Sequence, residues 1–243
     1  MNLIKLDAID STNSYLKELS TEKSIEDYTV ILANYQTSGR GQMGTKWSSQ
    51  SGKNLTFSVF KKINYLNNDE QFYISIAVSL AVFKALKQFN IPELKIKWPN
   101  DILSANQKIC GILIETIIKS NRIKAAIIGI GLNVNQTSFP GAINASSLKQ
   151  ITGIIYDRDE ILNHITSQMA IHVNLIYEGK FEELKGEYEQ YLFRKEKPST
   201  FKSSDGELFM GYIKGITNKG LLNVMLEDNA IKEFDLKEIK LLY

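Results

Sequence analysis

One stretch of this 243-residue chain governs its interpretation, and it reads Tyr28-Thr-Val-Ile-Leu-Ala-Asn34-Tyr-Gln36-Thr-Ser-Gly39-Arg40-Gly41-Gln42-Met-Gly44-Thr-Lys46-Trp47. An apolar strand runs straight into a basic loop. Three glycines within six residues let the backbone approach a ligand closely. Arg40 and Lys46 add positive charge, and Trp47 adds a flat apolar surface. The composition favours a phosphate or an adenylate as the ligand over a metal or a long polymer.

The same loop matches Gly-x-Gly-x-x-Gly, so a dinucleotide site is an alternative. That site needs a helix after the loop and an acidic residue about 20 positions later. Here residues 46–54 are turn-like, residues 55–60 alternate like a strand, and no carboxylate lies between Gly44 and Asp69. No Gly-Lys-Ser/Thr follows either, which excludes a Walker-type phosphate loop. A long glycine-rich hairpin connection remains the plain structural alternative.

Bulk properties exclude several classes of protein. A net charge of +2 is too close to neutral to favour nucleic acid or an anionic membrane as the principal partner. Cys110 is the single cysteine, so no internal disulfide forms, and with His164 and His172 it makes too small a set for zinc. The N-terminus lacks the features of a signal peptide. We therefore predict a cytoplasmic protein.

The pattern of elements predicts an α+β fold. Ser11-Thr12-Asn13 precedes a helical pattern as an N-terminal cap, and apolar residues recur at helical spacing in residues 70–89. Strands are predicted at residues 28–34, 55–60, 94–98, 102–104, 109–118 and 123–134, and helices at 159–177 and 181–193. These elements do not alternate as βαβ units, which argues against a doubly wound sheet.

The pattern of apolar and turn-forming residues changes after Pro198. Short β-like runs at residues 207–216, 221–226 and 231–234 are separated by turn residues, the pattern of a small, strongly bent barrel of about fifty residues. We therefore expect a main domain over residues 1–194 and a small domain over residues 195–243.

Four polar groups lie at the ends of these elements. Ser11-Thr12-Asn13 suits a carboxylate or phosphate at a helix N-terminus, although a plain cap explains it too. Gln36 at a strand end suits a urea or an amide. Lys97-Trp98-Pro99-Asn100-Asp101 presents two polar side chains at a turn, and an Asx turn is the structural alternative. Lys108 enters an apolar strand, where it either flanks the strand or brings a point charge into a pocket.

Together these segments resemble the biotin protein ligases over nearly the whole chain. The matching segments are Asp10-Ser11-Thr12-Asn13, Gln36-x-x-Gly39-Arg40-Gly41-x-x-Gly44-x-x-Trp47, Lys97-Trp98-Pro99-Asn100-Asp101, Lys108-x-x-Gly111-Ile112-Leu113-Ile114-Glu115 and Gly129-x-Gly131-x-Asn133-x-Asn135. The resemblance implies a catalytic domain related to class II aminoacyl-tRNA synthetases, with a mixed sheet, followed by an SH3-like barrel. It also implies the monofunctional type without a DNA-binding domain.

The resemblance implies a two-step reaction. The carboxylate of biotin attacks the α-phosphate of ATP to give biotinyl-5′-AMP, and a lysine of a biotin carboxyl carrier protein domain then takes the biotin. Mg²⁺ accompanies ATP, held by phosphate oxygens without a dedicated ligand cluster. The residues implied for biotin are Ser11, Thr12, Asn13, Gln36, Arg40, Gly41, Gln42, Lys108 and Gly111. Those implied for ATP and the adenylate are Arg40, Trp47, Lys108 and Asn133.

The implied catalytic residues are Arg40, Lys108 and Asp101. Arg40 and Lys108 would bring two anions together, and Asp101 would keep the acceptor lysine positioned and reactive. Members pair through an edge strand of the central sheet, and the apolar residues 123–134 would allow a homodimer, while a monomer stays open. A lipoate-protein ligase or related acyl-lysine transferase is the main alternative, and a non-catalytic biotin or nucleotide sensor is another.

One departure from the family pattern has a measurable consequence. Relatives often carry a basic residue where this chain has Gln42, so we expect biotinyl-AMP to be retained less well here. Gln42→Arg should slow dissociation of the adenylate, measured by chasing bound biotinyl-AMP from the two proteins. Equal dissociation rates would contradict this expectation.

Overall fold

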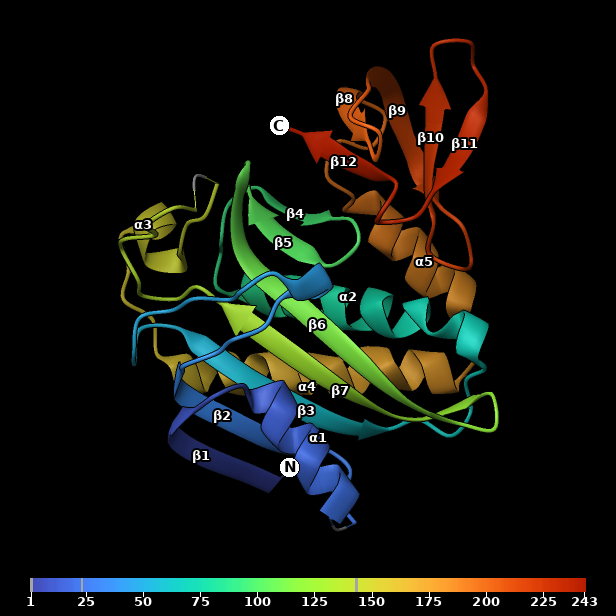
Figure 1. Ribbon diagram of the computed structural model, residues 1–243. Helices are drawn as coiled ribbons and strands as arrows, with labels where there is room; N and C mark the ends of the chain where they lie inside the picture. The colour runs from blue at the N-terminus through green and yellow to red at the C-terminus, as the bar shows by residue number, and fades with distance from the viewer. Residues whose placement is uncertain (1, 23, 143) are drawn as a thin grey trace.

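The computed structural model describes residues 2–22, 24–142 and 144–243 (Figure 1). Its centre is a seven-stranded mixed sheet in the order β1-β2-β3-β7-β6-β5-β4, in which only β1 and β2 run parallel. The strands are β1 (Asn2–Ile9), β2 (Thr29–Gln36), β3 (Leu55–Lys62), β4 (Leu94–Lys97), β5 (Asp101–Ser104), β6 (Gln107–Lys119) and β7 (Arg122–Leu132). The α+β class and the mixed sheet predicted from the sequence are confirmed.

Helices cover the sheet unequally. The helices are α1 (Thr12–Glu22), α2 (Phe72–Gln88), α3 (Leu148–Thr152), α4 (Arg158–Tyr177) and α5 (Phe181–Gln190). α2 and α4 pack side by side against one face, where they bury the main apolar core (Figure 1). The short α1 covers only part of the opposite face, over β2, β3 and part of β7, and a smaller apolar cluster lies beneath it. The rest of that face is therefore left for the glycine loop.

The position of β7 corrects one expectation. Residues 123–134 were expected to supply an edge strand for a homodimer. β7 instead lies inside the sheet, hydrogen-bonded to β3 on one side and to β6 on the other. Its backbone donors and acceptors are already used, so β7 cannot pair with a second copy of the chain.

The C-terminal residues form a separate antiparallel sheet in the order β11-β10-β9-β8-β12. Its strands are β8 (Pro198–Ser203), β9 (Leu208–Ile216), β10 (Leu222–Leu226), β11 (Ile231–Phe234) and β12 (Ile239–Leu242). Among the residues that the structure describes, no pairing joins the edge strands β11 and β12, so the sheet is open. The expected closed barrel is not confirmed.

Two of the hydrogen bonds between the C-terminal sheet and the main body involve Trp98 and Glu189. The indole Nε1 of Trp98 donates to the carbonyl of Gly220 over 2.9 Å, and a carboxylate oxygen of Glu189 in α5 accepts from the backbone N–H of Ile216 over 3.0 Å. Trp98 lies directly after β4. The turn that was singled out in the sequence is therefore tied to both parts of the molecule.

Four elements were not predicted. β1 has a mostly exposed burial pattern, α3 is only five residues long, and β8 and β12 have weak alternation. Short or edge elements leave little periodic signal in a sequence. In the part of the chain that the structure covers, no helix is both long and apolar enough to span a membrane.

The Trp98–Gly220 contact gives a prediction about stability. Gly220 has a φ of +87°, and a Cβ atom there would overlap the ring of Phe72. Gly220→Ala should therefore lower the free energy of unfolding by about 1–3 kcal/mol. The matched control is Gly186→Ala in α5, where a Cβ meets open space. It should raise stability by about 0.5–1 kcal/mol. Urea denaturation measures both, and equal midpoints for the two variants would contradict the prediction.

Candidate active site

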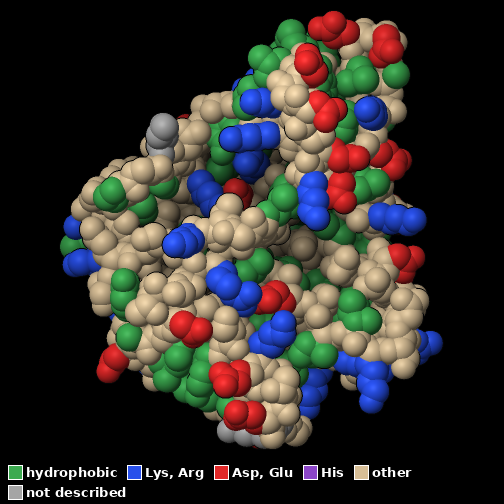
Figure 2. Space-filling model, viewed as in Figure 1, with side chains coloured by type: hydrophobic (Ala, Val, Ile, Leu, Met, Phe, Trp, Pro, Cys, Tyr) green, Lys and Arg blue, Asp and Glu red, His purple; other side chains and the backbone are tan. Residues whose placement is uncertain are grey.

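A hollow lies on the sheet face that α1 leaves uncovered. Figure 2 shows it from outside, with lysine and arginine side chains around its rim. It encloses a cavity of about 270 Å³ whose wall is formed by the start of α1, the glycine loop, the turn after β4, and β3, β6 and β7. Elements that are distant in the sequence therefore share one site.

Three glycines form the floor of this cavity. Gly111 on β6 pairs with Gly131 on β7, and Gly129 lies two positions before Gly131 on the same face. A Cβ atom on Gly131 would overlap the indole of Trp47, and one on Gly129 would overlap the amide of Asn13. A glycine weakens a strand because it packs no side chain. Here the missing side chains create the room in which Trp47 and Asn13 lie against the sheet.

The glycine loop is a small hairpin. The N–H of Gly41 donates to the carbonyl of Thr45 over 2.7 Å, and the N–H of Trp47 donates to the carbonyl of Gly39 over 2.9 Å. Two of its glycines are needed because a Cβ atom would strike the opposite arm, and Gly44 is needed because its φ is +76°. In this conformation the glycines serve the fold of the loop itself.

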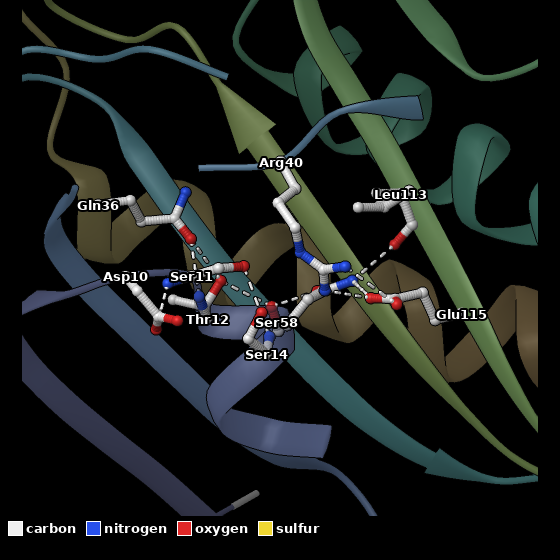
Figure 3. Close-up of polar contacts among 10 residues, drawn as sticks. Asp10, Ser11, Thr12, Ser14, Gln36, Arg40, Ser58, Leu113 and Glu115 are labelled. Carbon is white, nitrogen blue, oxygen red and sulfur yellow. Dashed lines mark hydrogen bonds and ion pairs between the residues drawn. The ribbon is translucent and has the colours of Figure 1, made fainter. Parts of the chain in front are cut away.

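One end of the cavity is a neutral hydrogen-bonded cluster (Figure 3). The side-chain oxygen of Gln36 accepts from the backbone N–H of Thr12 over 2.8 Å and from its hydroxyl over 3.0 Å. The hydroxyl of Ser58 lies 2.7 Å from that of Thr12 and 2.6 Å from the side-chain oxygen of Asn13. Thr12, Asn13 and Ser58 are almost completely buried. This end suits a neutral polar ring with N–H donors and a carbonyl acceptor.

Arg40 joins the loop to the sheet through Glu115. Its Nη2 lies 2.7 Å from Oε2 of Glu115, and its Nη1 lies 3.3 Å from Oε1 (Figure 3). The Nδ2 of Asn13 donates to the same Oε2 over 2.9 Å. One carboxylate therefore connects the glycine loop with the neutral cluster.

Lys108, a second cation on the cavity wall, is also paired with a carboxylate. Its Nζ lies 2.7 Å from Oδ1 of Asp101 and 5.8 Å from the ring centre of Trp47. Lys97 lies 3.9 Å from the second oxygen of Asp101. Burial lowers the pKa of Lys97 below its ordinary value, the nearby Lys108 pushes in the same direction, and Asp101 opposes both. Asp101 therefore lies between two ammonium groups.

The turn after β4 fixes Asp101. Asn100 is buried, and its side-chain amide donates to the carbonyl of Ile112 on β6. Tyr188 in α5 donates its hydroxyl to the carbonyl of Pro99 over 3.0 Å. The polar turn predicted from the sequence is thus held from two sides.

The structure places most of the residues singled out in the sequence on one cavity wall. These are Ser11, Thr12, Asn13, Gln36, Arg40, Gln42, Trp47, Asp101, Lys108 and Gly111. Two lie behind it. Asn133 is buried and donates its side-chain amide to the carbonyl of Ser146 over 3.0 Å, and Gly41 is part of the backbone pairing of the loop.

Sequence reasoning missed four residues of the site. Ser58 looked like the polar position of an alternating strand, and Glu115 stood in a quoted segment without a role. Gly129 and Gly131 could have been found from the sequence. Two glycines at alternate positions inside an apolar strand weaken that strand, and they often mark a place where another group approaches it closely.

Cys110 is the neighbour of Gly111 on β6, but its side chain points to the opposite face of the sheet. It is fully buried in the core under α2, and burial raises the pKa of its thiol far above the ordinary value. A thiol in this state is chemically inert. It takes no part in the site.

Comparisons with known proteins identify the family. Residues 6–133 match the model of the biotin/lipoate A/B protein ligase family, which covers half of the chain. The bifunctional ligase/repressor BirA of Bacillus subtilis is 31% identical over 246 residues, an alignment that covers 99% of this chain and 74% of that protein. The chain belongs to the biotin/lipoate A/B protein ligase family.

Two further relatives define the extent of the likeness. The bifunctional ligase/repressor BirA of Bacillus spizizenii is 36% identical over 169 residues, which are 68% of this chain and about half (51%) of that protein. The solved structure of the biotin protein ligase from Aquifex aeolicus in complex with biotin and ATP has a TM-score of 0.82 and 30% identity, and it covers 99% of this chain and 98% of that one. This member of the family thus shares both parts of the fold with a solved ligase.

Ser58 gives a prediction about the neutral cluster. Ser58→Ala leaves the side-chain oxygen of Asn13 without its buried donor, so unfolding should become easier by about 1–3 kcal/mol. The control is Ser79→Ala in α2, because the hydroxyl of Ser79 is buried without a partner. Its removal should be neutral or stabilising. Thermal and urea denaturation of both variants test this, and a Ser58→Ala protein as stable as Ser79→Ala would contradict it.

Proposed function

We propose that this chain uses ATP to convert biotin into biotinyl-5′-AMP and then transfers the biotin to a lysine of a carrier domain. One observation carries the proposal: a single cavity joins a neutral hydrogen-bonding cluster to cationic side chains, among them Arg40 from the loop and Lys108 from β6. The ureido ring of biotin is neutral and suits the cluster. Its carboxylate and the α-phosphate of ATP are anions and suit the cations. A solved relative in complex with biotin and ATP supports the same assignment.

In the first step, a carboxylate oxygen of biotin attacks the α-phosphorus of ATP. The bond from that phosphorus to the bridging oxygen breaks, and pyrophosphate leaves with the electron pair. The two reacting groups repel each other, so positive charge must be placed where they meet. Lys108 enters the cavity from the rigid β6 and Arg40 enters from the loop, and together they would hold the carboxylate and the phosphate side by side.

The size of the cavity implies that the loop moves during the reaction. Pockets for small molecules usually measure about 300–1,000 Å³. The cavity of about 270 Å³ lies below that range, and the indole of Trp47 fills part of the floor. A biotin and a nucleotide together need more room. We therefore propose that the hairpin of residues 39–47 lifts to admit the nucleotide and closes again to exclude water from the adenylate.

In the second step, the neutral amine of the acceptor lysine attacks the carbonyl of the mixed anhydride. An amide bond forms, AMP leaves, and the amine loses a proton. Asp101 is the carboxylate on the cavity wall, and it already binds two ammonium groups, those of Lys108 and Lys97. A third amine of the same kind would be positioned beside it.

We propose that Mg²⁺ comes to the site together with ATP. Asp101 is paired with lysines and Glu115 with an arginine, and no group of three or more His, Cys, Asp or Glu side chains that could hold a metal ion is found within residues 2–22, 24–142 and 144–243. Mg²⁺ would be held by phosphate oxygens of ATP, as is common for this ion.

The finer description of the two parts is also a proposal. We propose a catalytic domain of the class II aminoacyl-tRNA synthetase type over residues 1–194 and an opened SH3-like module over residues 195–243. The carrier partner is a biotin carboxyl carrier protein domain, and we propose that the chain works in the cytoplasm. Leu236, in the loop between β11 and β12, lines the cavity together with Trp98, so the C-terminal part of the chain contributes to the cavity wall.

One assay tests the proposed function. Pyrophosphate exchange into ATP is measured with biotin, with lipoate and with no acid. We expect exchange with biotin alone. Exchange with lipoate would assign the related lipoate-protein ligase activity. No exchange with either acid would leave a non-catalytic biotin or nucleotide sensor as the remaining function.

Two variants separate the two steps. Lys108→Ala should slow biotin-dependent pyrophosphate exchange by about 100-fold or more, because a charge contact to both anions is lost. Asp101→Ala should slow transfer from preformed biotinyl-AMP to the carrier domain more than it slows exchange. Lys5→Ala, which removes an exposed cation paired with Asp159, is the control and should change neither rate. Unaltered exchange in Lys108→Ala, or undiminished transfer in Asp101→Ala, would contradict the assigned roles.

A further inference from the structure

The two ion pairs of the cavity differ in what they connect. Lys108 and Asp101 both belong to the sheet, on the adjacent strands β6 and β5, so their pairing holds within one rigid element. Arg40 belongs to the loop, and its partner Glu115 belongs to β6. Opening the loop therefore has to break the second pair and can leave the first intact.

Glu115 also sets the orientation of the neutral cluster. An ionised carboxylate only accepts hydrogen bonds, so the amide of Asn13 must turn its Nδ2 toward Glu115. Its Oδ1 must then face Ser58, whose hydroxyl donates to it over 2.6 Å. The charge of Glu115 thus fixes the hydrogen-bond direction as far as Ser58. The part of the site for a neutral ring and the part for an anion meet at this one side chain.

We propose that Glu115 is a positioning residue. Its carboxylate pairs with the guanidinium of Arg40 until the anionic end of the substrate takes the place of Glu115. This inference rests on the function proposed above. In the structure the guanidinium of Arg40 is bound by a carboxylate of the protein itself. When biotin or its adenylate binds, its carboxylate or phosphate takes over the guanidinium, and Glu115 keeps only Asn13.

The exposure of the pair is suited to such an exchange. The Arg40 side chain is 42% exposed and that of Glu115 is 24% exposed. Ion pairs that remain in contact with water are weak and exchange readily, whereas a fully buried pair would resist separation. Arg40 lies on the cavity wall and Glu115 lies just beyond it, next to the wall residue Leu113. A substrate anion can therefore approach the guanidinium without first displacing any other side chain.

The proposal predicts that Glu115 competes with the substrate. Glu115→Gln keeps the shape of the side chain and an oxygen for Asn13, but it removes the charge that competes for Arg40. We expect Glu115→Gln to bind biotin about 1.5-fold to fivefold more tightly than the wild type, the range of one exposed ion pair. Binding of biotinol, in which a hydroxyl replaces the carboxylate of biotin, should be unchanged.

The experiment is isothermal titration calorimetry with biotin and biotinol on five proteins. These are the wild type, Glu115→Gln, the control Glu196→Gln, and the double variant Arg40→Ala/Glu115→Gln compared with Arg40→Ala alone. Glu196 pairs with Lys214 over 2.6 Å outside the cavity, so its variant makes the same change of net charge without the competition. We expect the tightening for biotin in Glu115→Gln only, and no effect of Glu115→Gln once Arg40 is removed.

Each other outcome has a distinct meaning. Equal weakening of biotin and biotinol would show that Glu115 merely supports Asn13 and would overturn the inference, as would tightening that persists without Arg40. A wild type that binds neither ligand would overturn the proposed function instead. If Glu115→Gln folds poorly, Glu115→Asp serves in its place, because its shorter carboxylate reaches Arg40 less well. It should show the same selective tightening at smaller size, and its absence would again overturn the inference.

Discussion

The site depends on a steric constraint. On one face of the central sheet, three glycines stand at positions where side chains would normally pack. Gly111, Gly129 and Gly131 lie on the adjacent strands β6 and β7, and a Cβ atom on any of them would meet Trp47, Lys108 or Asn13 closely. The opposite face of the same strands carries isoleucines that pack under α2 and α4. The sheet therefore packs on the apolar core with one face and borders the cavity with the other. This asymmetry lets a stable core and a ligand cavity share the same backbone.

Charge is arranged on this hollow face in opposed pairs. Arg40 is matched by Glu115, and Asp101 is shared by Lys108 and Lys97, so each of these cations has a carboxylate partner. Unpaired cations at a partly buried wall would be costly. The carboxylates stabilise the cations at this partly buried wall.

The sequence predicted the fold class, the long elements and most of the cavity wall. Strong periodicity gave α2 and α4, and polar residues at strand ends gave Gln36, Asp101 and Lys108. It could not predict β1 or α3, because an exposed edge strand and a five-residue helix have no strong pattern. It misplaced β7 at an edge, since an apolar strand reads the same whether one or two neighbours pair with it.

The remaining site residues required three-dimensional contacts. Glu115 and Asn13 are 102 positions apart, and Ser58 and Asn13 are 45 apart, so no local pattern signals their hydrogen bonds. The sequence likewise did not indicate that the C-terminal sheet is open. Turn residues fix where strands end, but closure depends on whether β11 and β12 meet.

The burial of Cys110 has a practical consequence. It is the only thiol in the sequence, and it is enclosed in the core with its proton retained. Maleimide dyes should therefore leave the folded native chain unlabelled. Cysteines introduced at Met43, which is exposed at the tip of the hairpin, and at an exposed position such as Lys232 on β11 would then be the sole attachment points for a donor and an acceptor fluorophore. The chain is thus ready for single-molecule distance measurements without first replacing its own sulfur.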